Sequence, residues 1–310
     1  MNISRRGLLS GAAAGALALG MPSARAQEPK SRKSTINLAI SSYSYWHFAE
    51  TKYPIEKVID KASELGVSGV DVLHRQMESE ERSYMNKLKR HAFVNGIDLI
   101  ALSIHQDFVS PDAAEQKKNI EHTIHCIELA HAMGIPCIRL NSGRWGTIRS
   151  FDDLMAARGI EPPIEGYTED DAFRWCIEGI EAVLPKAEEM GVILALENHW
   201  GLSRTPEGML RIAKAFDSPF FGLMLDTGNF MEDPYDKLEQ IAPHAVFIQA
   251  KTYYGGGEWY SLELDYKRIA SILYNAGFNG YVSLEFEGKA PADEGVPQSI
   301  AMLKEAFDLG

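Results

Sequence analysis

Short apolar segments alternate with longer amphipathic segments from residue 36 to the end of the chain. The apolar runs predict eight strands, at 36–41, 70–73, 99–104, 136–140, 192–196, 221–225, 245–248 and 281–284. The amphipathic stretches predict eight helices, at 54–65, 79–94, 112–133, 169–190, 205–216, 234–241, 266–275 and 299–307. Near-continuous apolar strands separated by helices are typical of a parallel sheet that is buried on both faces.

Eight strand and helix units predict an α/β fold, a (β/α)8 TIM barrel, whose active site lies at the carboxyl ends of the strands. A doubly wound sheet is the competing fold. The chain has neither a GxGxxG segment after its first strand nor a GxxxxGK[ST] segment, which counts against that alternative. Residues 144–166 predict an irregular insertion.

The beginning of the chain predicts a twin-arginine signal peptide. Arg5 and Arg6 precede an apolar stretch rich in Ala and Leu, and Ala24-Arg25-Ala26 resembles a cleavage site. The alternative is a disordered tail with a chance pair of arginines. The predicted division is a signal peptide at 1–26, a linker at 27–33 and a barrel at 34–310. We therefore expect a periplasmic or otherwise exported protein.

The charge of the chain excludes some partners. It has 31 Lys and Arg against 43 Asp and Glu, and a formal net charge of −12. The predicted leader holds three arginines and no acid, so cleavage leaves 28 basic residues and a net charge near −15. Such a chain repels polyanions, and we expect no nucleic-acid partner and no membrane partner after signal removal. A homo-oligomer is compatible with the sequence.

The cysteines indicate no special chemistry. Cys126, Cys137 and Cys176 form no CxxC pair and lie within apolar helix or strand patterns. An odd number of such residues predicts buried free thiols rather than a disulfide framework or a zinc knuckle.

Polar side chains follow the last four predicted strands at matching positions. Side chains alternate faces along a strand, so Glu197, Asp226, Gln249 and Glu285 can all point into the barrel. Three carboxylates so close need protonation or a cation. With one amide oxygen they form an all-oxygen set, which suits Mn, Mg or Co better than structural zinc. Each residue alone is equally well explained as a helix cap or a salt bridge.

Four segments together resemble a known family. LENH at 196–199, LDTGN at 225–229, FIQAK at 247–251 and GYVSLEFEG at 280–288 are similar to the sugar phosphate isomerase/epimerase superfamily with the xylose isomerase-like TIM barrel. The resemblance covers the chain from residue 36 to its end. It implies a small-molecule carbohydrate substrate.

The resemblance also implies a divalent metal, with Mn, Mg or Co favoured and Zn as a further candidate. In the family, the metal is held by Glu, Asp, His and Glu, which correspond to Glu197, Asp226, Gln249 and Glu285. Glutamine therefore replaces the family's histidine, a pattern that also resembles dehydroshikimate dehydratases. Asn229 stands where a substrate-binding histidine is frequent.

Catalytic roles follow from the same resemblance. Glu197 and Glu285 would flank the substrate and exchange a proton at the carbon next to a carbonyl, while the metal polarises that carbonyl. His105 matches a frequent family histidine, and we expect substrate contact or acid–base work rather than capping.

Further candidate residues each have an ordinary structural alternative. His199 supports a metal ligand or donates a proton, or packs in a loop. Asn141 binds a substrate hydroxyl, or shapes a turn. Lys251 binds an oxyanion, or pairs with Glu287. Trp46 stacks on a sugar, or anchors a loop.

Other residues are placed by their strand or helix. Asp71 and His74 lie on opposite faces of the second strand, and the family resemblance favours Asp71 inward. His122, His125 and His131 share one helix, where we expect solvent exposure or helix packing rather than a metal site.

Three functions remain open. The first is a metal-dependent isomerase or epimerase that acts on a ketose or keto-sugar through an enediolate. The second is a metal-dependent lyase or dehydratase acting on a 3-keto-glycoside or a dehydroshikimate-like substrate. The third is a sugar-binding barrel without catalysis. A DNA-repair endonuclease shares this fold, but the acidic charge and the few strand-end histidines count against it.

Overall fold

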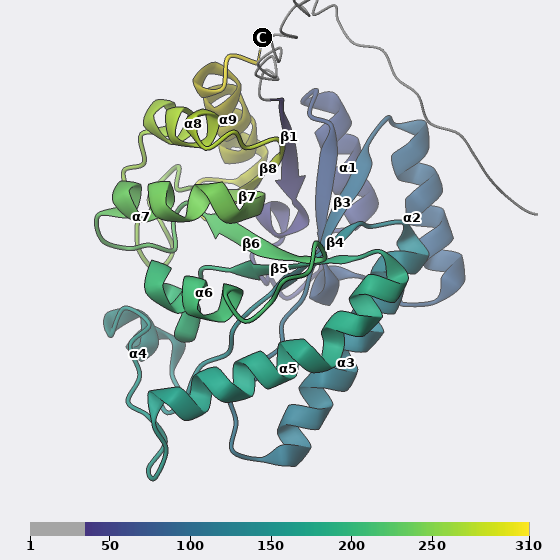
Figure 1. Ribbon diagram of the computed structural model, residues 1–310. Helices are drawn as coiled ribbons and strands as arrows, with labels where there is room; N and C mark the ends of the chain where they lie inside the picture. The colour runs from purple at the N-terminus through teal and green to yellow at the C-terminus, as the bar shows by residue number, and fades with distance from the viewer. Residues whose placement is uncertain (1–34, 310) are drawn as a thin grey trace, which may run out of the picture. The chain divides into compact units, whose positions relative to one another are not determined.

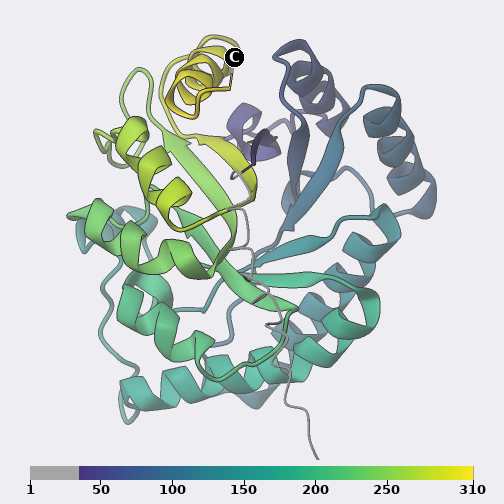
Figure 2. The same cartoon turned by 45° about the horizontal axis from the view of Figure 1, so that its top comes forward.

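The strands close into a parallel barrel in the computed structural model, which describes residues 35–309. They are β1 (Ile36–Ser41), β2 (Gly69–Leu73), β3 (Asp98–Ser103), β4 (Cys137–Leu140), β5 (Ile193–Glu197), β6 (Phe221–Asp226), β7 (Ala245–Thr252) and β8 (Gly280–Phe286). Each strand pairs with its neighbours in sequence, and β8 pairs with β1 to close the ring (Figure 2). The predicted (β/α)8 TIM barrel is confirmed. The predicted signal peptide and linker lie outside the described residues.

Helices surround this barrel (Figure 1). They are α1 (Ile55–Glu64), α2 (Arg82–Val94), α3 (Ala113–Met133), α4 (Phe151–Ala156), α5 (Glu169–Met190), α6 (Pro206–Ala213), α7 (Pro234–Ile241), α8 (Tyr266–Asn275) and α9 (Ala292–Ala306). One helix follows each strand, except that α4 and α5 both lie between β4 and β5. The predicted insertion thus contains a short helix. Across residues 35–309, no helix has the length and apolar character needed to cross a membrane.

The long helices have well-defined ends. The Asp112 side chain accepts a hydrogen bond from the Ala114 amide and so caps α3, whose last turn ends at Gly134. Thr168 and Asp171 form a reciprocal capping box at the start of α5. These caps explain why the sequence located both helices to within a residue.

Several boundaries differ from the prediction: α2 begins three residues later, α6 ends three residues earlier and β8 continues to Phe286. Two further differences are larger. β7 continues to Thr252, so Gln249 and Lys251 belong to the strand rather than to the loop after it. α9 begins at Ala292, not at 299, and Pro297 lies inside it. The sequence analysis began this helix after Pro297, because proline is tolerated in the first turn of a helix but is unfavourable in its interior.

Apolar side chains pack on both sides of the sheet. One cluster fills the space between the strands and the helices. A smaller one fills the inside of the barrel and consists of Ala39, Ile100, Ala101, Cys137, Ala195, Met224 and Phe247. The inward position that follows on β1, β3, β4, β5, β6 and β7 is polar in each case, so the interior changes from apolar to polar toward the carboxyl ends.

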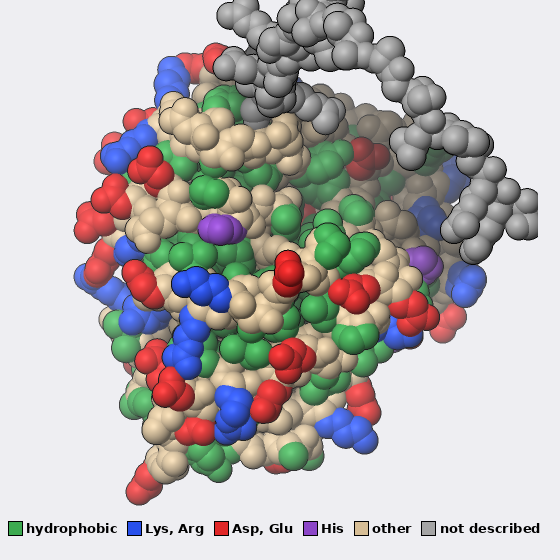
Figure 3. All heavy atoms as spheres, in the orientation of Figure 1, with side chains coloured by type: hydrophobic (Ala, Val, Ile, Leu, Met, Phe, Trp, Pro, Cys, Tyr) green, Lys and Arg blue, Asp and Glu red, His purple; other side chains and the backbone are tan. Residues whose placement is uncertain are grey.

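The cysteines and the surface agree with the sequence analysis. Cys126, Cys137 and Cys176 are buried free thiols, as predicted. On the face drawn in Figure 3, acidic and basic side chains are interspersed with apolar ones rather than gathered into a basic patch.

Candidate functional site

A cavity of about 410 Å³ lies at the carboxyl ends of the strands. Its lining residues are Ser41, Tyr43, Phe48, Leu73, Arg75, Ser103, His105, Arg139, Phe151, Glu197, His199, Trp200, Lys251, Trp259, Tyr260, Glu285 and Glu287. The lining is polar at the strand ends and aromatic in the loops. This is the end of a (β/α)8 barrel at which active sites form.

The four predicted oxygen ligands lie on neighbouring strands and are buried. Asp226 on β6 is in register with Gln249 on β7. The Gln249 amide donates from Nε2 to Oε1 of Glu285 on β8 at 2.5 Å. Glu197 ends β5, where its Oε1 accepts a hydrogen bond of 3.2 Å from Nδ2 of Asn229. We call Glu197, Asp226, Gln249 and Glu285 the carboxylate cup.

Lys251 places a cation among the carboxylates. Its Nζ lies 3.3 Å from Asp226 Oδ2, 3.0 Å from Glu285 Oε2 and 3.4 Å from Glu287 Oε1. It also donates to Oδ1 of Asn229 at 2.9 Å. Burial works against the charge, but the three carboxylates hold the pKa of Lys251 well above its usual range. Lys251 therefore lines the cavity and pairs with Glu287, as one of the two predicted alternatives stated.

The turn after β6 is shaped to admit this lysine. Asp226 Oδ1 accepts hydrogen bonds from the amides of Gly228 and Asn229 at 2.7 and 3.1 Å. A Cβ atom on Gly228 would lie 2.7 Å from Cδ of Lys251. Asn198 ties the same turn to β5, because its side chain exchanges two hydrogen bonds with the backbone of Asp226.

Arg139 is a second buried cation, and the sequence analysis did not identify it. Its Nη1 lies 3.3 Å from Glu197 Oε2, and its Nη2 donates to the Ile104 carbonyl at 2.9 Å. Nη2 also lies 3.4 Å from Nε2 of His105. Burial, together with the charge of Arg139, lowers the pKa of His105 to about 2, so this imidazole is neutral. The available signal was Arg139 at an inward position of the predicted fourth strand.

Burial makes the acidic residues weaker acids than usual. It raises the pKa of Glu197 to about 8, against the opposing effect of Arg139. Burial also raises the pKa of Asp226 to about 6 and that of Glu287 to about 7, and Lys251 opposes both shifts. Carboxyl groups of this kind exchange protons near neutral pH, which is what general acid–base catalysis requires.

The donor set of the cup fits a hard divalent cation. Gln249 Oε1 is buried and has no hydrogen-bond partner among residues 35–309, and the buried oxygens Glu197 Oε2 and Asp226 Oδ2 have only their ion pairs with Arg139 and Lys251. Buried polar atoms of this kind are costly unless a further partner satisfies them, and oxygen donors suit Mg²⁺, Mn²⁺ or Co²⁺. The charge argument from the sequence assumed that the carboxylates lacked a cation. The structure corrects that assumption, since Lys251 and Arg139 already balance part of the charge.

Asp71 lies inside the barrel beside the cup. It is fully buried, and its Oδ1 accepts a hydrogen bond of 2.9 Å from Oγ of Ser103. Burial raises the pKa of Asp71 to about 7, although the Ser103 hydrogen bond lowers it. His74 leaves β2 on the other side, near His122 on α3.

Aromatic rings form the wall of the cavity opposite the strand ends. The Phe151 and Trp259 ring centroids are 4.7 Å apart, and those of Trp200 and Tyr260 are 6.3 Å apart. His199 lines the cavity beside Trp200, at 5.2 Å between centroids. Phe151 comes from α4, so the insertion contributes to the site.

Three predicted substrate-binding residues do not line this cavity: Trp46, Asn141 and Asn229, whose side chain instead bonds to Glu197 and Lys251. The Trp46 indole donates to the Ala49 carbonyl at 2.8 Å and packs 5.0 Å from the Phe48 ring. Asn141 exchanges two hydrogen bonds through its backbone with the side chain of Gln106. Their geometry matches loop anchoring for Trp46 and a structured turn for Asn141.

Comparison with solved structures shows the same fold at low sequence identity. A D-psicose 3-epimerase determined in the presence of D-fructose matches 88% of this chain and 100% of its own, with 18% identity and a TM-score of 0.69. A 3-keto-D-glucoside 4-epimerase from E. coli matches 87% of this chain and 100% of its own, with 14% identity and a TM-score of 0.67. An L-ribulose 3-epimerase matches 88% and 93%, with 17% identity and a TM-score of 0.64.

Sequence comparison assigns the family. No curated protein sequence matches the chain. The model of the xylose isomerase-like TIM barrel family matches residues 59–306, which is most of the chain. The chain therefore belongs to the xylose isomerase-like TIM barrel family.

Proposed function

We propose that the protein is an exported, metal-dependent sugar isomerase or epimerase. It would move a proton at the carbon next to the carbonyl of a ketose or keto-sugar. The observation that carries this proposal is a pair of carboxylates in one cavity, each beside its own cation: Glu197 beside Arg139, and Glu285 beside Lys251. The sugar epimerases with the same fold support it.

The two carboxylates divide the proton transfer. One removes the proton from the substrate carbon, and the other returns a proton to the opposite face, which inverts that carbon. The pKa of Glu197, raised by burial to about 8, suits a group that gains and loses a proton near neutral pH. We assign Glu197 and Glu285 as the acid–base pair.

The cations stabilise the negative charge that develops on the carbonyl oxygen. Lys251 and Arg139 are buried, so their charges act through a medium of low dielectric and have a larger effect than in water. A divalent ion held by Glu197, Asp226, Gln249 and Glu285 supplies further polarisation of the carbonyl when bound. His105 is neutral and adjoins Arg139, from where it can donate or accept a hydrogen bond to a substrate hydroxyl.

The remaining lining suits a carbohydrate. A volume of about 410 Å³ is within the range of small-molecule sites. Trp200 and Trp259 offer apolar faces to the sugar ring, while Lys251 and His199 offer polar groups to its hydroxyls. Export through the twin-arginine signal would place the enzyme where free sugars and glycosides are better supplied than sugar phosphates.

Product analysis in deuterated water tests this function. The purified protein is incubated with ketohexoses, ketopentoses and 3-keto-glucosides in the presence of Mn²⁺, Mg²⁺ or Co²⁺. We expect a product of unchanged composition that carries one deuterium at the inverted carbon. Glu197→Gln and Glu285→Gln should each reduce kcat by about 10²–10⁴-fold.

Two outcomes would contradict the proposal. Release of water or an aglycone instead of an epimer would make the protein a lyase. Sugar binding by calorimetry without deuterium exchange on any substrate would make it a binding protein. Enzyme stripped of metal by EDTA should lose activity, and Mn²⁺ should restore it. Full activity after stripping would overturn the metal dependence alone.

A further inference from the structure

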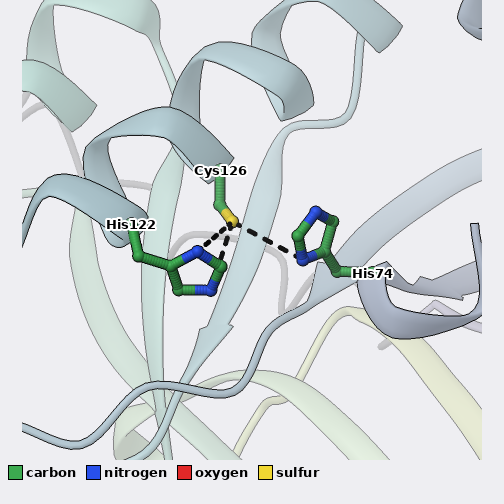
Figure 4. Close-up of side chains that lie close together, drawn as sticks. All are labelled: His74, His122 and Cys126. Carbon is green, nitrogen blue, oxygen red and sulfur yellow. Dashed lines mark hydrogen bonds between the residues drawn. The ribbon is translucent and has the colours of Figure 1, made fainter. Parts of the chain in front are cut away.

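A second group of metal-ligating side chains lies outside the barrel, between the loop after β2 and helix α3. His74 begins the short helix η2 (His74–Gln76), and His122 and Cys126 are one turn apart on α3. Figure 4 shows that both imidazoles approach the Cys126 sulfur from different elements. We call these three residues the His/Cys cluster. Their ligand atoms all lie within 4.8 Å of one another.

The distances within the cluster match those of a zinc site. Cys126 Sγ lies 3.8 Å from Nδ1 of His74 and 3.7 Å from Nε2 of His122. Tetrahedral zinc with Zn–S near 2.3 Å and Zn–N near 2.05 Å requires S···N separations of about 3.6 Å. The two sulfur–nitrogen separations are therefore close to those that a shared ion imposes.

Glu80 fixes the orientation of His74. Its Oε1 lies 2.8 Å from Nε2 of His74, and its Oε2 lies 2.7 Å from Nε2 of His125. A carboxylate on the far nitrogen is the usual partner of a metal-bound histidine, because it fixes the tautomer and leaves the other nitrogen free to bind. Here that other nitrogen, Nδ1, is the one that faces Cys126.

A thiol hydrogen bond accounts for only part of this arrangement. One S–H proton serves one nitrogen, whereas the sulfur adjoins both imidazoles. Among the described residues, the His122 ring has no other hydrogen-bond partner. The sequence analysis expected solvent or helix packing for the α3 histidines because it did not bring His74 to them.

We propose that the His/Cys cluster binds Zn²⁺. The ligands are Cys126 Sγ, Nδ1 of His74 and Nε2 of His122, and the thiol proton leaves as the Zn–S bond forms. His74 and His122 also line a cavity together with Lys52, Arg75, Glu80 and His105. Arg75 and His105 also line the main cavity, so the ion would hold η2 in the position that presents Arg75 to the substrate.

Cobalt spectroscopy on the full chain tests the proposal. The purified protein is stripped of metal, and Co²⁺ is titrated in past two equivalents, so that the cup as well as the cluster can be filled. We expect a sulfur-to-cobalt charge-transfer band in the near ultraviolet, which Zn²⁺ abolishes by displacement. The carboxylate cup contains no sulfur, so an ion bound there cannot produce this band.

Variants separate the cluster from general effects on α3. Cys126→Ser should abolish the band, and His122→Ala should weaken Zn²⁺ binding at least 10-fold. Glu80→Gln should weaken it about 10–100-fold, as loss of such a supporting carboxylate usually does. His131→Ala is the matched control, because His131 lies on α3 but adjoins the Met190 carbonyl instead. Circular dichroism establishes that each variant is folded.

The proposal fails if no charge-transfer band appears once Co²⁺ exceeds the two equivalents that the cup and the cluster could bind together. It also fails if folded Cys126→Ser binds as many equivalents of Zn²⁺ as the parent. Either result is independent of sugar turnover, so it leaves the proposed enzymatic function untouched.

Discussion

The carboxylate cup and the His/Cys cluster gather titratable side chains in opposite ways. The cup uses oxygen donors from four adjacent strands, and two buried cations of the chain balance them. The cluster uses nitrogen and sulfur donors from a loop and an outer helix, and its neighbouring charge is the carboxylate of Glu80.

The proposed ions would be separated by this difference in donor atoms. Hard ions such as Mg²⁺ and Mn²⁺ prefer carboxylate and amide oxygens, whereas Zn²⁺ prefers imidazole and thiolate. The two groups also need opposite protonation states. In the cup, Lys251 must stay charged beside the carboxylates, whereas the imidazoles of the cluster must be neutral to bind a metal ion.

The largest effect is expected from removing Lys251, the cation inside the cup. Lys251→Met leaves Asp226, Glu285 and Glu287 buried without their shared ammonium group. Removing one partner of a buried ion pair costs about 3–5 kcal/mol, so we expect the metal-free protein to lose stability by that amount. Mn²⁺ should restore much of it, because a bound ion replaces the lost charge. Urea unfolding with and without Mn²⁺ measures both effects.

Lys267→Met is the matched control for this variant. Lys267 pairs with Glu305 at 2.7 Å, but both side chains are exposed. Such pairs contribute little, so no measurable change in unfolding is expected. Equal losses from the two lysine variants would show that the buried position of Lys251 has no special importance.

The fold was predictable because its signals repeat along the chain. Each apolar strand is short, and each helix is amphipathic, so eight repeats of that pattern indicate the barrel. Ends marked by local chemistry, such as Gly134 and Gly191, agree with the structure. The start of α9 was missed because Pro297 is a local signal that tertiary packing overrides.

The cup and the cluster were not equally predictable. Strand parity alone places Glu197, Asp226 and Gln249 on inward positions, and the structure brings them together. The contact of His74 with Cys126 joins residues 52 positions apart, on a loop and an outer helix. No periodicity in the sequence encodes such a contact. Arg139 was not predicted as a site residue, because an arginine inside an apolar strand only interrupts the apolar pattern.

A smaller effect should follow from loss of the cation beside Glu197. Arg139→Met removes a positive charge that holds the pKa of Glu197 down against burial. That pKa should rise, so the ionised base becomes available only at higher pH. We expect kcat/KM at neutral pH to fall about 10–100-fold, and its acidic limb to move to higher pH. Arg139→Lys keeps the charge and should shift the profile less. If the acidic limb of the pH profile does not move in Arg139→Met, Arg139 does not affect the acid–base step.

The last expected effect concerns Asp71, which is buried beside the cup and forms no ion pair within residues 35–309, although the charge of Arg139 acts on it. Its folded pKa, about 7, exceeds the ordinary value of 3.8, so the folded protein disfavours the ionised form. The stability of the parent should fall as pH rises from about 4 to about 7, whereas Asp71→Asn does not titrate there. The variant should therefore match the parent near pH 4, apart from a constant offset, and gain stability over it progressively until about pH 7.

Ser103→Ala should have the opposite effect on the pH dependence of stability, through the same residue Asp71. Ser103 donates to Asp71 and lowers its pKa, so loss of the hydroxyl should make the stability of the protein depend more steeply on pH. Urea unfolding across this pH range measures both variants. A gain for Asp71→Asn that does not change with pH would mean that packing, not charge, sets the cost of this residue. In that case Asp71 would not behave as a buried ionisable group, and only the residues of the cup would show an effect of buried charge on stability.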